Sequence, residues 1–304
     1  MRFANELKVV GLVDIDLEAL RRAADVYGLS PEVMFEADDD RWRELRPDLV
    51  IDSSPPWLHL EHAIQAFEIG ADLIVSKPLA LDADQAAEIV SRADAGCRSL
   101  WVAQQMRYFP CFLEVRRMLA VGEIGAIEHV AIEMTLDGRG WPAGHAWRAD
   151  LPEPLLTEAG IHHVDLIRWV LDDELADMRL WTWNPSSSPF RGNSSAAGLI
   201  TTRRDVPVTY FASFAPNGRE SVRFDSGWTV TGSTGTIVVA DGGVLVCRDG
   251  SPPQEVLPPS EVPVGLDVLN ERVLHAVVTG NAQSLSGTEN LRGLIPLLAS
   301  TVRS

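Results

Sequence analysis

Apolar and polar positions in the first third of the chain form two kinds of segment. Short, β-branched apolar runs are typical of parallel strands buried on both faces, and longer runs with apolar residues three or four positions apart are typical of helices. The first pattern predicts strands at residues 7–13, 48–52, 71–78 and 99–105. The second predicts helices at residues 16–27, 59–70 and 82–95. Strict alternation of strand and helix predicts a doubly wound, Rossmann-like parallel sheet.

After about residue 105 the pattern changes. It predicts helices at 110–121 and 157–171, a half-exposed strand at 126–136, and closing helices at 266–279 and 288–302. Between 177 and 248, alternating segments separated by turns rich in Gly, Asn, Pro and Ser predict an open antiparallel sheet, with one face solvated or used for assembly. We therefore expect an α/β dinucleotide-binding domain at 1–105 and an α+β domain for substrate binding and oligomerisation at 106–304.

The first domain is predicted to be incomplete. A doubly wound dinucleotide domain opens with a strand, a G-x-G-x-x-G turn and a helix, and no such turn occurs in this sequence. The strand that ends at Asp14 has the features of the second strand of such a domain, and residues 1–6 would be the tail of the first helix. We expect a fragment or a misassigned start; a natural domain that has lost its cofactor is the alternative.

Composition limits the partners. The 304 residues carry a formal net charge of −17, which disfavours nucleic acids and anionic membranes. It does not disfavour a dinucleotide, whose phosphates are bound by backbone N–H groups at a helix N-terminus. Three scattered cysteines disfavour a disulfide framework and indicate a reducing, cytoplasmic compartment. No apolar run approaches the roughly 18 residues of a membrane span, and the first residues have no signal-peptide pattern.

Several motifs then occur in a fixed order along nearly the whole chain. They are SSPPWLHLEHAIQAFEIGADLIVSKPLA (53–80), RYFP (107–110), GEIGAIEHV (122–130), WR (147–148), EAGIHHVDLIRW (158–169), GSTGTI (232–237) and GTENLRGL (287–294). As an ordered set they resemble the glucose–fructose oxidoreductase/inositol dehydrogenase/MocA family of NAD(P)-dependent oxidoreductases. Two positions depart from that family's pattern, because Ser76 replaces a glutamate and Glu158 replaces an aspartate.

The resemblance implies hydride transfer between a nicotinamide and a secondary alcohol of a sugar, sugar acid or cyclitol. That reaction needs a base for the hydroxyl proton and a positive group that stabilises the alkoxide. We expect His162 to be the base, since an imidazole titrates near neutral pH, and Lys77 to polarise the hydroxyl and position the nicotinamide. Helical spacing places His162 in one polar stripe with Glu158, Asp165 and Trp169.

Further residues are expected to bind the cofactor or the substrate. The cofactor set is Asp14, Ser54, Pro55, His59, Lys77 and Gln104. The substrate set is Gln105, Arg107, Trp147, Glu158 and Asp165. An acid at position 14 favours NAD over NADP, because it would repel a 2′-phosphate. Structural roles stay open for several positions: Asp14 as a helix cap, His59 and His163 as packing residues, and Trp141 and Trp147 as loop anchors.

Two other functions remain as alternatives. The first is a cofactor-deficient, non-catalytic ligand-binding or regulatory protein with the same fold, which the missing glycine turn favours. The second is a metal-dependent hydrolase or isomerase that would use Glu158, His162, His163 and Asp165, although His163 lies off the polar stripe. For the leading hypothesis we expect a small polyol or sugar substrate, and a homodimer or homotetramer that assembles through the open sheet.

Overall fold

The computed structural model describes residues 7–139, 143–218, 220–259 and 264–300. The first half alternates strand and helix as predicted. Its elements are β1 (Leu12–Asp14), α1 (Leu17–Tyr27), β2 (Met34–Glu36), β3 (Leu49–Asp52), α2 (His59–Glu68), β4 (Asp72–Val75), α3 (Ala83–Ala95) and β5 (Leu100–Val102). Helix α1 begins after Asp16, whose side chain accepts a hydrogen bond from the Glu18 N–H, and ends at Gly28, which has φ 64°. The expected helical tail at 1–6 lies outside the described residues.

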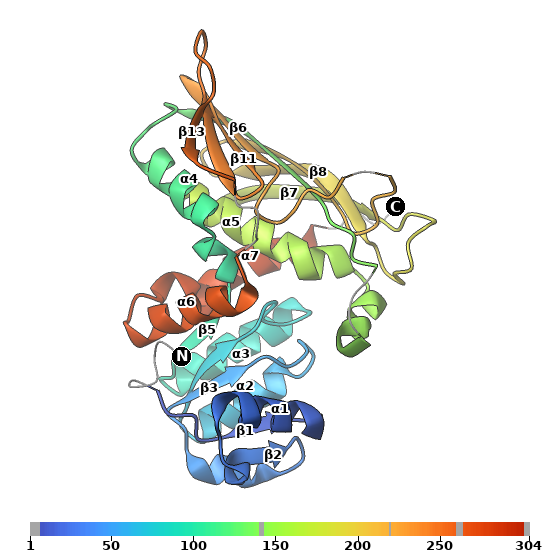
Figure 1. The fold of residues 1–304 in the computed structure, drawn as a ribbon, viewed down its shortest axis with the longest axis vertical. Coiled ribbons are helices and arrows are strands. Elements are labelled where there is room, and N and C mark those ends of the chain that lie inside the picture. Colours follow the sequence, from blue (N-terminus) through green and yellow to red (C-terminus); the bar gives the residue numbers. More distant parts are fainter. Residues whose placement is uncertain (1–6, 140–142, 219, 260–263, 301–304) are drawn as a thin grey trace.

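The strands of this half form two separate parallel sheets. One pairs β1 with β2, and the other has the order β3-β4-β5. Figure 1 shows the labelled strands β5, β3, β1 and β2 in succession down the lower part of the molecule. Two details differ from the sequence prediction, because the strand predicted at 7–13 is paired only from Leu12 onward and β2 was not predicted. With three residues, β2 is too short to give a clear alternating pattern.

The second half is built on one eight-stranded sheet with the order β13-β12-β11-β10-β6-β9-β8-β7. Its strands are β6 (Ile127–Thr135), β7 (Leu175–Trp183), β8 (Ser195–Thr202), β9 (Pro207–Ser213), β10 (Trp228–Gly232), β11 (Gly235–Ala240), β12 (Gly243–Cys247) and β13 (Gln254–Leu257). The expected antiparallel sheet is therefore mixed, since β6 and β9 are parallel neighbours. Strand β6 enters between β9 and β10, and sequence alternation carries no information on such a long-range pairing.

Helices cover one face of this sheet. Figure 1 shows α4 (Pro110–Ala120), α5 (Ile161–Leu171) and α7 (Gly287–Ala299) beneath the strands. Every residue of α5 except Trp169 is buried, so the expected division into a core face and a cleft face is wrong. The helix lies between the sheet and α7, where a Cβ on Gly293 would meet the Val164 side chain at 3.3 Å.

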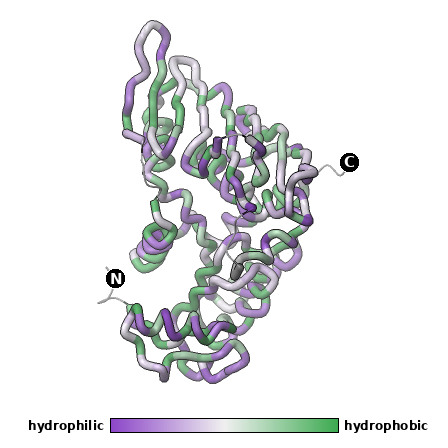
Figure 2. The backbone as a smooth tube through the Cα atoms, turned by 45° about the vertical axis from the view of Figure 1, so that its right-hand side comes forward, coloured by the Kyte–Doolittle hydropathy of each residue, from purple (hydrophilic) through white to green (hydrophobic). Residues whose placement is uncertain are grey.

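The last helices return to the first half. Helix α6 (Leu266–Val278) packs Val273 and Ala276 into one apolar cluster with Ile74 of β4, and Trp101 of β5 forms a bridge with Ser286. Residues predicted to belong to the second domain thus cover a sheet of the first. Figure 2 shows hydrophobic and hydrophilic positions interspersed along both halves. None of the helices in the described ranges is long and apolar enough to cross a membrane.

Candidate functional site

Lys77 and Glu158 bring the two halves of the chain together. Lys77 follows β4 at the carboxyl edge of the β3-β4-β5 sheet, and Glu158 lies in a single π-helical turn, Leu156–Gly160, that leads into α5. The Lys77 Nζ donates hydrogen bonds to Glu158 Oε2 at 2.7 Å and to the Glu158 carbonyl at 3.1 Å. Arg148 Nε lies 3.1 Å from the same carboxylate oxygen. The side chains of Lys77 and Glu158 are only 13% and 10% exposed, so this ion pair is shielded from bulk water.

His162 lies one helical turn beyond Glu158. Its Nδ1 is 3.0 Å from Gln104 Oε1, and both side chains are buried. An amide oxygen can only accept, so Nδ1 carries the proton and Nε2 keeps its lone pair. The buried Gln104 Nε2 has no hydrogen-bond partner among the described residues, so only the oxygen of the amide that orients the His162 ring is satisfied.

Burial and charge set the protonation states. Burial, together with the Lys77 charge, holds the pKa of His162 well below 6.5, so the imidazole is neutral at neutral pH. Burial also lowers the pKa of Lys77, although the Glu158 carboxylate opposes that effect. For Glu158 burial favours the neutral acid, but Lys77 and Arg148 outweigh it and leave the pKa below its usual value. The site thus combines a neutral base with an ammonium–carboxylate pair.

Arg148 and Gln104 are the two residues whose place differs most from the sequence prediction. Arg148 was not predicted as a site residue, although it lies in the quoted WR motif and an arginine beside an aromatic residue is a recognisable signal. Its guanidinium lies 4.4 Å from the centroid of the Trp147 ring. Gln104, expected to contact a cofactor, accepts a hydrogen bond from His162 Nδ1 through its side-chain oxygen.

Arg107 and Asp165 bind each other. The guanidinium donates to both carboxylate oxygens, at 2.6 and 2.5 Å, and Arg107 Nη1 also donates to the Ser284 carbonyl at 2.7 Å. Both side chains are buried. Arg107 and Asp165, both expected to bind substrate, thus satisfy each other's hydrogen-bonding groups. This pairing favours a structural role for them. Gln105, two residues before Arg107, has a buried Oε1 with no hydrogen-bond partner in the part of the chain that the structure describes.

The other residues expected to bind the cofactor surround the ends of β1 and β3. His59 is fully buried, with its ring nitrogens 3.1 Å from the Leu79 carbonyl and 3.0 Å from the Ser54 carbonyl, so it joins the loop between β3 and α2 to the segment just after Lys77. Pro55 lies in the same loop. Asp14 is exposed and accepts from the Asp16 N–H, while the α1 cap is Asp16 itself.

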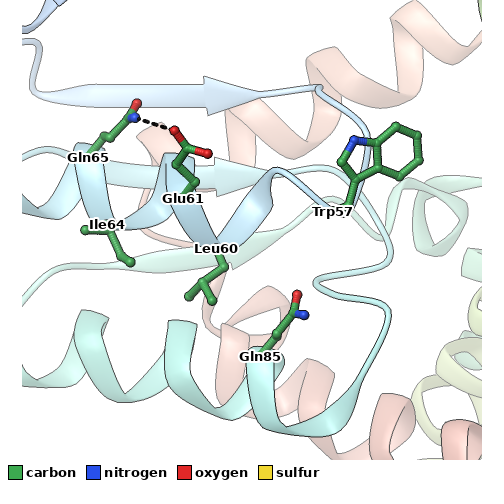
Figure 3. A pocket seen from close by; sticks show the side chains of 6 residues that line it. All are labelled: Trp57, Leu60, Glu61, Ile64, Gln65 and Gln85. Atoms are coloured by element: carbon green, nitrogen blue, oxygen red, sulfur yellow. Dashed lines mark hydrogen bonds between the residues drawn. The ribbon is translucent and has the colours of Figure 1, made fainter.

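Trp147 contacts a tryptophan of the first half. Its ring lies 4.8 Å from that of Trp57 in an edge-to-face arrangement. Trp57 also lines a hollow of about 440 Å³ along α2 and α3 (Figure 3), which is lined by Trp57, Leu60, Glu61, Ile64, Gln65 and Gln85. None of the four residues Lys77, Gln104, Glu158 and His162 lines that hollow, so it is separate from the candidate site. Trp141 lies outside the described residues.

The four residues of the metal-dependent alternative do not converge. Glu158 pairs with Lys77, Asp165 pairs with Arg107, and His163 Nδ1 lies 3.0 Å from the Tyr210 hydroxyl. Burial lowers the pKa of His163 to about 4, which fits the structural role expected for it. Within the described ranges no group of three His, Cys, Asp or Glu side chains could hold a metal ion.

A dinucleotide also needs a cradle for its phosphates, and the described helix N-termini of the first half do not fit one. Asp16 caps α1 and Asp82 caps α3, so a carboxylate already accepts from the backbone N–H groups that would face an anion. Helix α2 follows Leu58, and its preceding loop, Ser54–Trp57, contains no glycine. The described residues therefore supply the groups for acid–base chemistry but no cradle for a pyrophosphate.

The first half is a Rossmann-like domain with a lysine at a strand end, and the second half, which contains the open sheet, contributes an acid and a histidine to the same site. These features define the class of two-domain NAD-binding oxidoreductases. Residues 1–104 match the family model described as "Oxidoreductase family, NAD-binding Rossmann fold", and residues 112–238 match the "GFO/IDH/MocA C-terminal domain". Together they cover about three-quarters of the chain. The chain belongs to the GFO/IDH/MocA oxidoreductase family, and the expectation of NAD as cofactor is confirmed for that family.

Individual relatives are distant. Inositol 2-dehydrogenase 1 of Saccharopolyspora erythraea is 28% identical over 245 residues, which are 80% of this chain and 69% of that protein. The uncharacterized protein y4oX of Sinorhizobium fredii is 24% identical over 209 residues, 69% of this chain and 58% of that protein. The chain thus spans from just over half to about two-thirds of the length of these two curated relatives.

Solved structures agree on the fold. An oxidoreductase from Agrobacterium radiobacter, in complex with NAD+, L-tartaric acid and magnesium, has a TM-score of 0.82 at 19% identity, covering 96% of this chain and 87% of that one. An inositol dehydrogenase homolog from Azotobacter vinelandii, complexed with NADH and myo-inositol, has a TM-score of 0.78 at 18% identity, covering 97% and 86%. The predicted two-domain α/β plus α+β fold is therefore confirmed.

Proposed function

We propose that the chain carries the acid–base half of an NAD-dependent dehydrogenase site for a secondary alcohol of a sugar, sugar acid or cyclitol. The observation that carries the proposal is the meeting of Lys77, at the carboxyl edge of the β3-β4-β5 sheet, with two residues of the second half. Lys77 pairs with Glu158, and its charge helps to lower the pKa of His162, one helical turn further on. A strand-end ammonium and a neutral imidazole held at one junction are the two groups that alcohol oxidation requires.

Each group has a defined task. His162 Nε2 takes the proton of the reacting hydroxyl, because its ring is neutral and Gln104 fixes the proton on Nδ1. The Lys77 Nζ donates to the same oxygen and stabilises the negative charge that develops there. Glu158 keeps the ammonium in place. A bound nicotinamide would accept the hydride.

The cofactor preference rests on Asp14. It ends β1 beside the exposed start of α1, and it is followed by Ile15 and Asp16. A 2′-phosphate would meet the Asp14 and Asp16 carboxylates at this strand end, and the nearby Arg22 is already paired with Asp16 at 3.6 Å. NAD is therefore proposed over NADP.

A substrate screen tests the function. Polyols, aldoses and cyclitols are each incubated with the chain and NAD, and NADH formation is followed at the nicotinamide absorbance. Because the described residues offer no phosphate cradle, we expect the chain to bind NAD weakly and to reduce it slowly with at least one of these substrates. The reaction with NADP should be slower still.

A second measurement separates turnover from binding. Nuclear magnetic resonance of the His162 ring reports substrate contact without any cofactor. Polyol binding at His162 without turnover would favour the non-catalytic alternative, which the missing phosphate cradle supports. A His162 signal that no polyol perturbs, together with no turnover, would refute the proposed site.

We also propose that the chain self-associates through the face of the eight-stranded sheet that the helices leave open. Along β7–β9 this face presents large apolar side chains, with Trp181 57% exposed and Leu199 49% exposed. The Trp183 and Phe211 rings stack with their centroids 6.4 Å apart. Trp181 on β7 and Phe211 on β9 are both register partners of Ala197 on β8, so their side chains lie on the same face of the sheet. Large exposed apolar side chains gathered on one face of a sheet often mark an interface, and an isologous dimer is the commonest arrangement.

Trp181→Glu is expected to convert the oligomer to a monomer. In a symmetric dimer each partner would bury one of these introduced charges in the same interface. Light scattering after size exclusion measures the mass. The matched control is Val26→Glu, since Val26 is 74% exposed on α1 and lies away from the sheet. A monomeric wild type, or an unchanged oligomer in Trp181→Glu, would contradict the proposal.

A further inference from the structure

The hollow along α2 and α3 lies at the edge of the β3-β4-β5 sheet that also carries Lys77. In a parallel sheet the carboxyl end of each strand leads into the N-terminal end of the next helix, so helix starts gather at that edge. Leu60 and Glu61 lie in the first turn of α2, which follows β3. Gln85 lies in the first turn of α3, which follows Lys77 along the chain. The hollow therefore shares an edge of the sheet with the candidate site, although the site residues do not line it.

A series of side-chain contacts joins the hollow to the candidate site. Arg148 Nε lies 3.1 Å from Glu158 Oε2, and the Arg148 guanidinium lies 4.4 Å from the centroid of the Trp147 ring. That centroid lies 4.8 Å from the centroid of Trp57, which lines the hollow. Two side chains thus lie between the Lys77–Glu158 pair and the wall of the hollow. A ligand of two linked sugar rings is long enough to contact both places.

The lining of the hollow suits a neutral polyhydroxy compound. Trp57 is 47% exposed, and Figure 3 shows Leu60 and Ile64 pointing from α2 toward α3. Carboxylate and amide groups come from Glu61, Gln65 and Gln85. The C–H face of a sugar ring packs on an aromatic ring, and its hydroxyls can donate to a carboxylate and accept from an amide. None of the six lining residues in the described part of the chain is a cation, so they offer an anionic group no partner.

The hollow also has the size and order of a small-molecule site. Its volume of about 440 Å³ falls within the roughly 300 to 1,000 Å³ that ligand pockets occupy. Gln65 Nε2 donates to Glu61 Oε1 at 3.2 Å, as Figure 3 shows, so these two polar side chains hold each other along α2. Mostly apolar walls with a few fixed polar groups are typical of such pockets.

We propose that the hollow is a second sugar subsite and that Trp57 determines its specificity. The inference rests on the proposed function, because the first sugar is the one that reacts at Lys77 and His162. A second sugar unit, linked to the first, then packs on Trp57 and reaches the polar groups of Glu61 and Gln85. The substrate class is therefore a disaccharide or glycoside rather than a single free sugar.

Calorimetry without NAD tests the subsite. The full chain is titrated with maltose, cellobiose and lactose, and separately with glucose and galactose. At least one disaccharide is expected to bind at least about 10-fold more tightly than its constituent monosaccharides, because truncation of a tryptophan at a binding site commonly costs this much. Trp57→Ala should bring that ratio of affinities close to one. Trp57→Phe keeps an aromatic ring and should retain most of the preference.

The matched control is Trp42→Ala, because Trp42 is a partly buried tryptophan of the first half that does not line the hollow. Circular dichroism checks that each variant folds. The absence of a disaccharide preference in the wild type, an unchanged ratio in Trp57→Ala, or an equal loss in Trp42→Ala would each overturn the subsite.

NADH formation with the same sugars separates this inference from the proposed reaction. A disaccharide preference that depends on Trp57, without turnover of any sugar, would support the subsite and count against the reaction. Turnover of monosaccharides without a disaccharide preference would support the reaction and overturn the subsite.

Discussion

Lys77→Ala and His162→Ala are each expected to lower turnover of the preferred substrate by at least about 10²-fold. Without the imidazole, no group at the site takes the hydroxyl proton from the position that His162 Nε2 holds. Without the ammonium, the developing oxyanion loses the positive charge of Lys77, and Arg148 does not replace it because its Nε is directed at Glu158. Steady-state kinetics with NAD measure the loss, and kcat should fall more than KM rises, because both groups act on the transition state.

Matched controls are available in the chain. Lys8→Ala and His129→Ala remove the same side-chain types from exposed or half-exposed positions outside the site, and both should retain wild-type rates. The wild-type pH profile gives a second check. Since the pKa of His162 lies well below 6.5, the acidic fall in rate should begin only below that pH, and the alkaline fall should begin below 10.5, because the pKa of Lys77 is lowered. Wild-type-like kcat in either site variant would refute the role assigned to that residue.

The fold was largely predictable because its elements are local. Helices α1, α2 and α3 each begin and end within two residues of the predicted positions, since caps such as Asp16 and stops such as Gly28 are encoded beside the helix. The order of strands in the second sheet was not predictable in this way. The parallel pairing of β6 with β9 joins residues about 80 positions apart, and no local pattern specifies it.

The site was predictable in composition but less so in geometry. Ordered motifs indicated Lys77, Glu158 and His162, and the structure brings these residues together. The contact of Gln104 with His162 spans 58 positions between β5 and α5, so spacing could not reveal it. The prediction that the polar stripe of the helix faces a cleft was also wrong in part, because the polar side chains of α5 other than Trp169 are buried. Helical periodicity shows which residues share a face but not what covers that face.

Asp165→Asn is expected to lower the free energy of unfolding by about 3 to 5 kcal/mol. The side chains of Asp165 and Arg107 are only 4% and 6% exposed, so the amide would leave a guanidinium buried without a counter-charge. Arg107 also donates to the Ser284 carbonyl, which ties the segment after β5 to α5 and to the turn before α7. The loss should therefore appear in one cooperative urea transition that includes both halves of the chain.

A double-variant cycle distinguishes this structural role from the substrate-binding role that the sequence first indicated. Replacing the pair by apolar residues, Arg107→Met with Asp165→Leu, should recover part of the stability, because no unpaired charge then remains buried. If Asp165 instead binds substrate hydroxyls, Asp165→Asn should weaken polyol binding while the urea midpoint stays near that of the wild type. A change in unfolding free energy below about 0.5 kcal/mol would place Asp165 in the substrate site. A large loss that the apolar pair relieves would place Asp165 in the framework that positions the helix carrying His162.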